Sequence, residues 1–433
     1  MWFHLTYKIN YLQMKNIIKF RLVTSLLSLL ITISSCEKNG TKDQTSDPGD
    51  PVNISTEIYQ KEVIDSANRF AFDLFKSILS NTKGTDNIMI SPFSITSALS
   101  MTLNGASGET FEAMKKALGL DEKTLEQINE TYLKLMTEMV PVDERVVVEI
   151  ANSVWIEKHL TVKEPFMKAL ETWYKAESRE INVLDPEAID IVNGWIAEKT
   201  HDKITEMLNF LEPDLAMLLI NAVYFNGKWR NQFDKADTRE EPFFTAPSTP
   251  EVVPMMHKEE NLKAAKEGNV TIVDIPYGRG NYSMLVVLPD EWIPPSEVAV
   301  ALTPSKWNEW TDLLENKTLK VELSMPRFKY EYKRTLNDDL INMGMGIAFS
   351  DGANFSNISN TGLMISRVEH QTFIETNEEG TEAAAATVVV MIETVSGGGP
   401  LPITLNRPFL YFIHEISTGT ILFMGILSDP SVE

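Results

Sequence analysis

The chain has 433 residues, of which 43% are apolar, so it can build a sizeable folded core. It carries 39 Lys and Arg against 61 Asp and Glu, a net charge of -22, which argues against nucleic acid as a partner. Its single cysteine, Cys36, excludes an internal disulfide and a cysteine metal cluster.

The first 35 residues are predicted to be a removed signal peptide. From Met14, three basic residues precede an apolar run over 22–33 that is too short to span a bilayer well. The sequence ISSC at 33–36 resembles the bacterial lipobox, whose cysteine is lipidated and begins the mature protein. By that resemblance Cys36 is the lipidation site, translation starts at Met14, and the protein is anchored in a bacterial cell envelope. An ordinary secretory signal is the alternative. Glu37 after the cysteine favours the outer membrane, by analogy with lipoprotein sorting in enteric bacteria.

Residues 36–55 are polar and rich in Asp, Gly and Pro, which predicts a flexible tether before a folded domain over 56–433. Helical periodicity is found over 59–79, 94–103, 108–118, 124–139, 163–175 and 187–199. Strand-like runs follow over 145–157, 216–229, 269–277, 282–290 and 319–328, and a hairpin over 408–427 turns at 417–419. These elements predict one α+β domain with helices first and a mostly antiparallel sheet later.

A catalytic site is not predicted. The sequence has no GxSxG, HExxH, P-loop or dinucleotide fingerprint, and the SNTK at 80–83 lacks the companion motifs of penicillin-interacting enzymes. The six histidines are scattered without the spacing of metal ligands. We therefore expect neither an enzyme nor a metal site.

The segment EEGTEAAAATVVVMIETVSGGGP at 378–400 has a composition that no single secondary structure explains. Four alanines, among the best helix formers, precede a β-branched run that leads into three glycines. Its composition alone leaves open which structure the segment adopts.

That segment resembles the hinge and reactive-centre loop of a serpin, and four others agree with it in order. They lie at 87–110, 220–233, 352–359 and 407–413, while the segment containing the hinge starts at 368. The resemblance implies the serpin fold, with helices packed on a large central, mostly antiparallel sheet, two smaller sheets, and an exposed reactive-centre loop over about 378–403.

The resemblance also implies a suicide-substrate inhibitor of serine proteases, monomeric and without a cofactor, whose cleaved loop inserts as an extra strand and traps the acyl-enzyme. The hinge set is Glu378, Gly380, Thr381, Ala383, Ala384, Ala385 and Ala386. Gly380 supplies backbone freedom and the alanines fit a closing sheet. With a period of two, Thr381 would face the core. The alternative is a non-inhibitory serpin-fold binding protein whose loop is cleaved as a substrate.

The family's spacing places the reactive bond between Thr394 and Val395, with a slip of one residue possible either way. A small residue on the acyl side, after Val390, Met391 and Ile392, suits an elastase-like protease with a shallow apolar pocket. Subtilisin-like or papain-like cysteine proteases are alternative targets. The sequence SGGGPLPI at 396–403 departs from the family by being longer and richer in glycine.

Two groups of residues match positions that control insertion in serpins. The shutter, a hydrogen-bonded cluster under the central strands, comprises Ser91, Ser94, Asn221 and His370. The breach, where the loop first enters, comprises Trp229 and Arg327, and the resemblance pairs Arg327 with Glu378.

Overall fold

The computed structural model describes residues 49–381 and 399–432, which belong to one compact unit. The predicted signal peptide, Cys36, Ala383–Ala386 and the bond between Thr394 and Val395 lie outside the described residues. Within the described ranges, no helix combines the length and apolar character needed to cross a bilayer.

The first half of the domain is mainly helical. Helices α2 (Ile58–Ser80), α3 (Pro92–Leu103), α4 (Gly108–Ala117), α5 (Leu125–Glu138), α6 (Glu164–Tyr174) and α7 (Ala188–Lys199) correspond to the six predicted from periodicity. The start of α3 is encoded locally, since the Ser91 side chain accepts a hydrogen bond from the Ser94 N–H and Pro92 occupies the first turn. Later come α8 (Pro295–Val300), α9 (Pro304–Glu315), α10 (Asn337–Leu340) and short turns over Ile341–Phe349.

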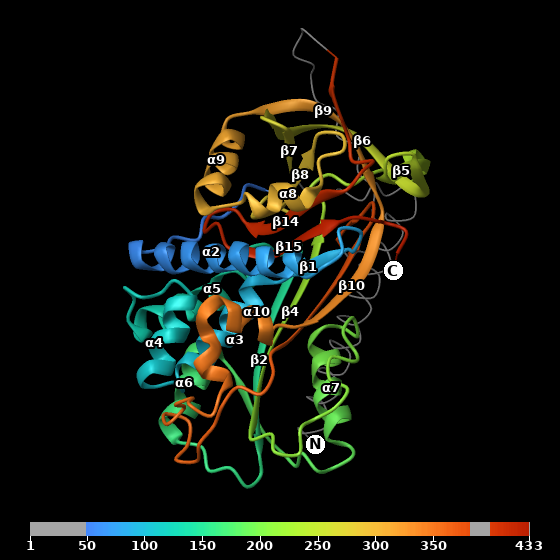
Figure 1. The fold of residues 1–433 in the computed structure, drawn as a ribbon. Coiled ribbons are helices and arrows are strands. Elements are labelled where there is room, and N and C mark those ends of the chain that lie inside the picture. Colours follow the sequence, from blue (N-terminus) through green and yellow to red (C-terminus); the bar gives the residue numbers. More distant parts are fainter. Residues whose placement is uncertain (1–48, 382–398, 433) are drawn as a thin grey trace, which may run out of the picture. The chain divides into compact units, whose positions relative to one another are not determined.

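A six-stranded sheet forms the centre of the domain, in the order β10-β11-β12-β4-β2-β3. Its strands are β10 (Phe328–Thr335), β11 (Glu369–Thr376), β12 (Gly380–Thr381), β4 (Met217–Lys228), β2 (Val146–Glu157) and β3 (Glu177–Ile181). All pairs are antiparallel except β2 with β3. In Figure 1, α7 lies beside one face of β4 and β2, and α3, α4 and α6 lie on the other side.

The second sheet has nine strands. Its main path runs β1-β15-β14-β8-β7-β6-β9-β13, with β5 paired to β6. The strands are β1 (Ile88–Ile90), β5 (Arg239–Ala246), β6 (Thr249–Glu267), β7 (Val270–Pro276), β8 (Tyr282–Pro289), β9 (Thr318–Pro326), β13 (Leu401–Thr404), β14 (Phe409–Glu415) and β15 (Ile421–Leu427). The predicted α+β class, with helices packed on a large central sheet, is confirmed. The two smaller sheets expected from the resemblance are continuous here, because the 19-residue β6 pairs with β9 along one part and with β7 along another.

The last residues of the predicted tether pack onto the domain. Ile54 is buried in the main core, and its N–H donates to the Ser417 hydroxyl at 3.0 Å. Val52 exchanges hydrogen bonds with the Asn281 side chain. The burial of Ile54 and these hydrogen bonds attach the end of the polar segment to the domain. The ordered domain therefore begins several residues before α2.

Candidate functional site

The hinge begins inside the six-stranded sheet. In β12, Gly380 pairs with Lys228 and Thr381 pairs with Gly227 of β4, while Thr381 also pairs with Thr376 of β11. Gly380 has φ of +156°, and a Cβ there would clash with the Gly227 carbonyl, so this position requires glycine. Both ends of the predicted loop interval therefore belong to sheets, since 401–404 forms β13.

Thr381 faces the core, on the side that period-two alternation predicts. Its side chain is 4% exposed, and its hydroxyl lies 2.7 Å from the Tyr277 hydroxyl and 3.4 Å from that of Thr376. Tyr277 is stacked on Trp229 with ring centroids 4.4 Å apart. Burial raises the pKa of Tyr277 above its ordinary value, which keeps the phenol neutral and able to hydrogen-bond Thr381. Sequence reasoning missed Tyr277.

Trp229 and the residues after it hold the turn before β12 through backbone contacts. The Trp229 N–H donates to the Glu379 carbonyl at 2.9 Å, and its indole N–H donates to the Asn377 carbonyl at 2.9 Å. The Phe233 N–H donates to the Glu378 carbonyl at 3.0 Å. These three bonds hold the backbone of the turn that precedes β12.

Arg327 and Glu378 form the ion pair that the resemblance implied. The Arg327 Nε donates to both carboxylate oxygens at 2.8 and 2.9 Å, and the Thr238 hydroxyl donates to the same carboxylate. The Glu378 side chain is 2% exposed, against 41% for Arg327. Burial raises the pKa of Glu378, but the hydrogen bonds from Arg327 and Thr238 outweigh it and the net pKa lies below its ordinary value.

Replacing Arg327 with Ala is expected to destabilise the domain by about 2–3 kcal/mol, because a buried carboxylate loses its charged partner. The measurement is the free energy of unfolding in guanidinium at pH 7. Arg327→Lys, which keeps the charge but loses the fork geometry, should show about half the loss. An Arg327→Ala variant as stable as wild type would mean that water replaces the guanidinium.

The structure brings the four predicted shutter residues together. The Ser91 N–H donates to His370 Nε2 at 3.0 Å, and the Ser94 hydroxyl donates to the Asn221 carbonyl at 3.4 Å. The Asn221 amide donates to Asn152 Oδ1 at 2.6 Å, which adds a residue of β2 that the sequence did not reveal. The Asn221 side-chain oxygen has no hydrogen-bond partner in the described part of the chain, although the residue is 8% exposed.

His370 is neutral in the folded state, because burial lowers its pKa to about 3. The unfolded histidine titrates near 6.5, so below that pH the unfolded state binds the extra proton. The free energy of unfolding should therefore fall as pH drops from about 6.5 toward 3, by up to about 1.4 kcal/mol per unit from this group. Denaturant unfolding between pH 4.5 and 7.5 measures it.

The matched variants for this prediction are His370→Gln, which retains an acceptor for Ser91, and His159→Gln at an exposed histidine. His370→Gln should flatten the slope below pH 6.5, and His159→Gln should leave it unchanged. Equal slopes in all three proteins would assign the acid sensitivity to other groups.

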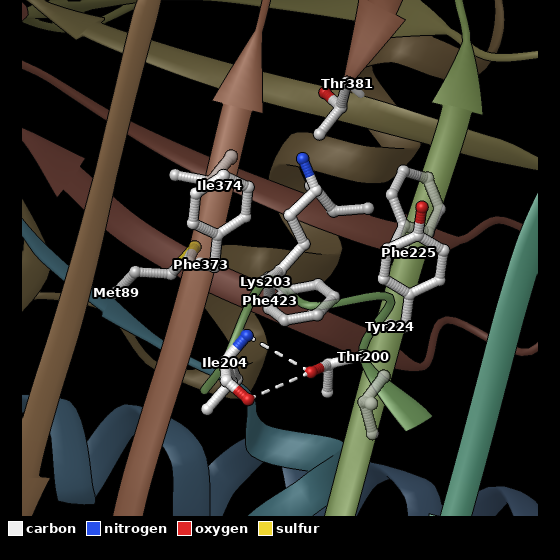
Figure 2. A pocket seen from close by; sticks show the side chains of 12 residues that line it. Met89, Thr200, Lys203, Ile204, Tyr224, Phe225, Phe373, Ile374, Thr381 and Phe423 are labelled. Carbon is white, nitrogen blue, oxygen red and sulfur yellow. Dashed lines mark hydrogen bonds between the residues drawn. The ribbon is translucent and has the colours of Figure 1, made fainter. Parts of the chain in front are cut away.

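Below Thr381, cavities follow the line between β4 and β11, and we call this line the seam. A cavity of about 20 Å³ lies directly beneath Thr381, between Val223–Phe225 of β4 and Phe373–Ile374 of β11 (Figure 2). A cavity of about 10 Å³ touches Ser91, Asn221 and Gln371, and one of about 370 Å³ continues along Met217–Asn221. Within the described residues, β12 alone pairs between β11 and β4, and it contributes two residues.

In the described part of the chain, the central strands β4 and β11 are joined only by the two residues of β12 at the buried glycine hinge, and this arrangement defines the class of protein. The chain belongs to the serpin family: the family signature, described as serpin (serine protease inhibitor), matches residues 65–430. Members of this family are generally protease inhibitors and not catalytic enzymes, although some do not inhibit.

The similarity to known proteins extends over nearly the whole domain. The chain is 34% identical to human Serpin B4 over 383 residues, covering 84% of this chain and 98% of that protein. It is 32% identical over 388 residues to an uncharacterized serpin-like protein of Thermococcus kodakarensis, covering 88% of this chain and 89% of that protein. The crystal structure of Tengpin, a thermophilic serpin in the native state, is similar with a TM-score of 0.78 and 34% identity, over 88% of this chain and 97% of that one. A thyroxine-binding globulin in complex with thyroxine has a TM-score of 0.77 and 28% identity, over 85% and 99%.

Proposed function

We propose that this protein is an inhibitory serpin that traps serine proteases by inserting its cleaved loop into the six-stranded sheet. The observation that carries the proposal is the seam below Thr381, where no described strand lies between β4 and β11 and the hinge is already aligned between them. A strand that continues from Thr381 in the same register would meet the edges of both neighbours.

The chemistry follows the acyl-enzyme step of serine proteases. The protease serine attacks the carbonyl carbon of Thr394, the bond to Val395 breaks, and the new amine takes the proton. The hinge end of the loop then carries an ester-linked protease. Insertion of 382–393 would drag that protease along the seam faster than water can release it. The chain needs no cofactor for this, acts as a monomer, and contributes no catalytic residue.

The target class is inferred from the residues before the bond. Thr394 and the apolar residues Val390, Met391 and Ile392 suit a shallow apolar specificity pocket, so we propose elastase-like proteases as partners. Subtilisin-like and papain-like cysteine proteases are the next classes to test.

We also propose that Cys36 carries a lipid anchor in a bacterial envelope, with secretion as the alternative. The support is the basic, apolar and lipobox-like order of 14–36 and the polar residues after it. Mass spectrometry of the amino-terminal peptide from membranes tests this: an acylated Cys36 supports the anchor, and an unmodified terminus elsewhere contradicts it.

The experiment for the inhibitory function mixes residues 37–433 with pancreatic elastase on a denaturing gel, with mass spectrometry of the released peptide. We expect a complex that survives denaturation and a peptide that begins at Val395. Clean cleavage without a complex, repeated across a protease panel, would favour a non-inhibitory binding protein. The similarity to a thyroxine-binding globulin makes that the second candidate.

A further inference from the structure

Lys203 is held over the seam by a turn that follows α7. The Lys203 N–H donates to the Thr200 carbonyl at 3.0 Å, and the Thr200 hydroxyl accepts from the Ile204 N–H at 3.1 Å. His201 and Asp202 both have left-handed backbones, with φ of 51° and 60°. Two consecutive non-glycine residues with positive φ are unfavourable, so this turn has a strained backbone. The turn sets the position of Lys203, the next residue.

The Lys203 side chain lies along the outer face of the seam. Its Nζ is 3.7 Å from the Glu375 carboxylate and 5.0 Å from the centre of the Phe373 ring, both on β11. Figure 2 shows it between β11 and β4, with its amino group directed toward Thr381. Lys203 and Thr381 line the same cavity of about 20 Å³. A cation therefore sits where an inserting strand would first pass.

The observed register identifies what that strand would bring. Thr381 pairs with Thr376 in an antiparallel ladder, so continuation by one residue places Glu382 opposite Glu375. Because Thr381 faces the core, its successor would face outward, on the side where Lys203 and Glu375 lie. Two carboxylates directly opposite each other on one face of a sheet repel. Insertion would begin with this unfavourable pair unless a cation lay beside it.

We infer that Lys203 is a positioning residue for loop insertion, and that it supplies the positive charge that receives Glu382 beside Glu375. This inference rests on the proposed inhibitory function. It adds a residue that affects whether the acyl-enzyme is trapped by loop insertion or hydrolysed to release the protease. Lys203 lies on the outer face of the sheet below Thr381 and takes no part in cleavage. Its loss should change the partition of the acyl-enzyme and leave the rate of acylation unchanged.

The test compares Lys203→Met with Lys199→Met. Lys199 is a matched control, because its Nζ also lies over an aromatic ring, that of Trp195, and also pairs with a glutamate, Glu177. Glu177 is in β3, the edge strand of the sheet, and not at the seam. With pancreatic elastase, we measure the number of inhibitor molecules consumed per protease trapped, the rate of acylation, and the melting temperature of the uncleaved chain. Lys203→Met should raise the consumption about two- to five-fold, the range expected for one partly exposed ion pair, with acylation unchanged. Lys199→Met should not raise it.

The double variant tests the electrostatic reason. Adding Glu382→Gln to Lys203→Met removes the repulsion and should return consumption to near the wild-type value, whereas Glu382→Gln alone should have little effect. No rescue, or an equal rise in Lys199→Met, would overturn the inference and leave the inhibitory function standing. If Lys203→Met lowered the melting temperature but left the consumption per trapped protease unchanged, Lys203 would only stabilise the fold, and the inference would be wrong. If the wild-type chain trapped no protease of a broad panel, the proposed function and this inference would both be wrong.

Discussion

Thr381→Arg is expected to convert the protein from an inhibitor into a substrate. Thr381 is buried between β4 and β11, and its hydroxyl forms a hydrogen bond with Tyr277. Just before it in the chain, the Glu379 carbonyl accepts a hydrogen bond from the Trp229 N–H. An arginine at this position is expected to keep the hinge out of the sheet in the uncleaved chain, so that insertion would have to bury an unpaired charge, which costs several kcal/mol even after relaxation. At 1.36 kcal/mol for each factor of ten, insertion should slow by at least about 100-fold.

The measurement is again the yield of denaturation-resistant complex with pancreatic elastase. Thr381→Arg should give cleaved inhibitor and active protease at a rate of cleavage like that of wild type. Thr318→Arg, the same change at an exposed position of β9, is the control and should keep normal trapping. If Thr381→Arg trapped protease as well as wild type, the hinge would not enter the sheet on this path.

The elements that the sequence revealed are those whose own pattern decides their structure. The six helices from α2 to α7 carry apolar residues at helical spacing, and β8 and β15 are mostly apolar runs buried on both faces. The short strands β1, β3 and β13 were not predicted. Nor were β5, β6, β10 and β11. Their sequences are rich in charge, and β5 and β6 also contain proline, as in EVVPMMHKEE at 251–260, so pairing with neighbours makes them strands.

The site residues also divide into those that the sequence predicted and those that it did not. Ser91, Ser94, Asn221, His370, Trp229 and Arg327 were placed by a resemblance between short segments, and the structure gathers them around β4, β11 and the hinge. Tyr277, Asn152 and Lys203 come from segments that carry no such motif, and their neighbours are set by tertiary packing. The entry of Gly380 and Thr381 into the sheet of the uncleaved chain was also not predicted, because no local pattern states how far a hinge is inserted.

Cleavage of the loop is expected to raise the melting temperature by about 10–20 °C. Among the described residues, only the two of β12 lie between β4 and β11, so most of their facing edges has no described strand between them. A strand formed by 382–393 would add hydrogen bonds along both edges and fill cavities that now touch Asn221 and Gln371. At about 1 kcal/mol net for each hydrogen bond, the gain is on the order of 10 kcal/mol.

For a domain of this size, each kcal/mol moves the melting temperature by roughly 1–2 °C. Calorimetry before and after cleavage by a protease that is not trapped measures the shift. Thr381→Arg, cleaved at the same bond, is the matched control and should gain little, because the buried charge of an arginine at position 381 would keep the hinge out of the sheet. An equal gain in both proteins would mean that relaxation outside the sheet stabilises the cleaved chain. No gain in the wild-type protein would mean that the seam stays open after cleavage, and the loop would then be only a substrate.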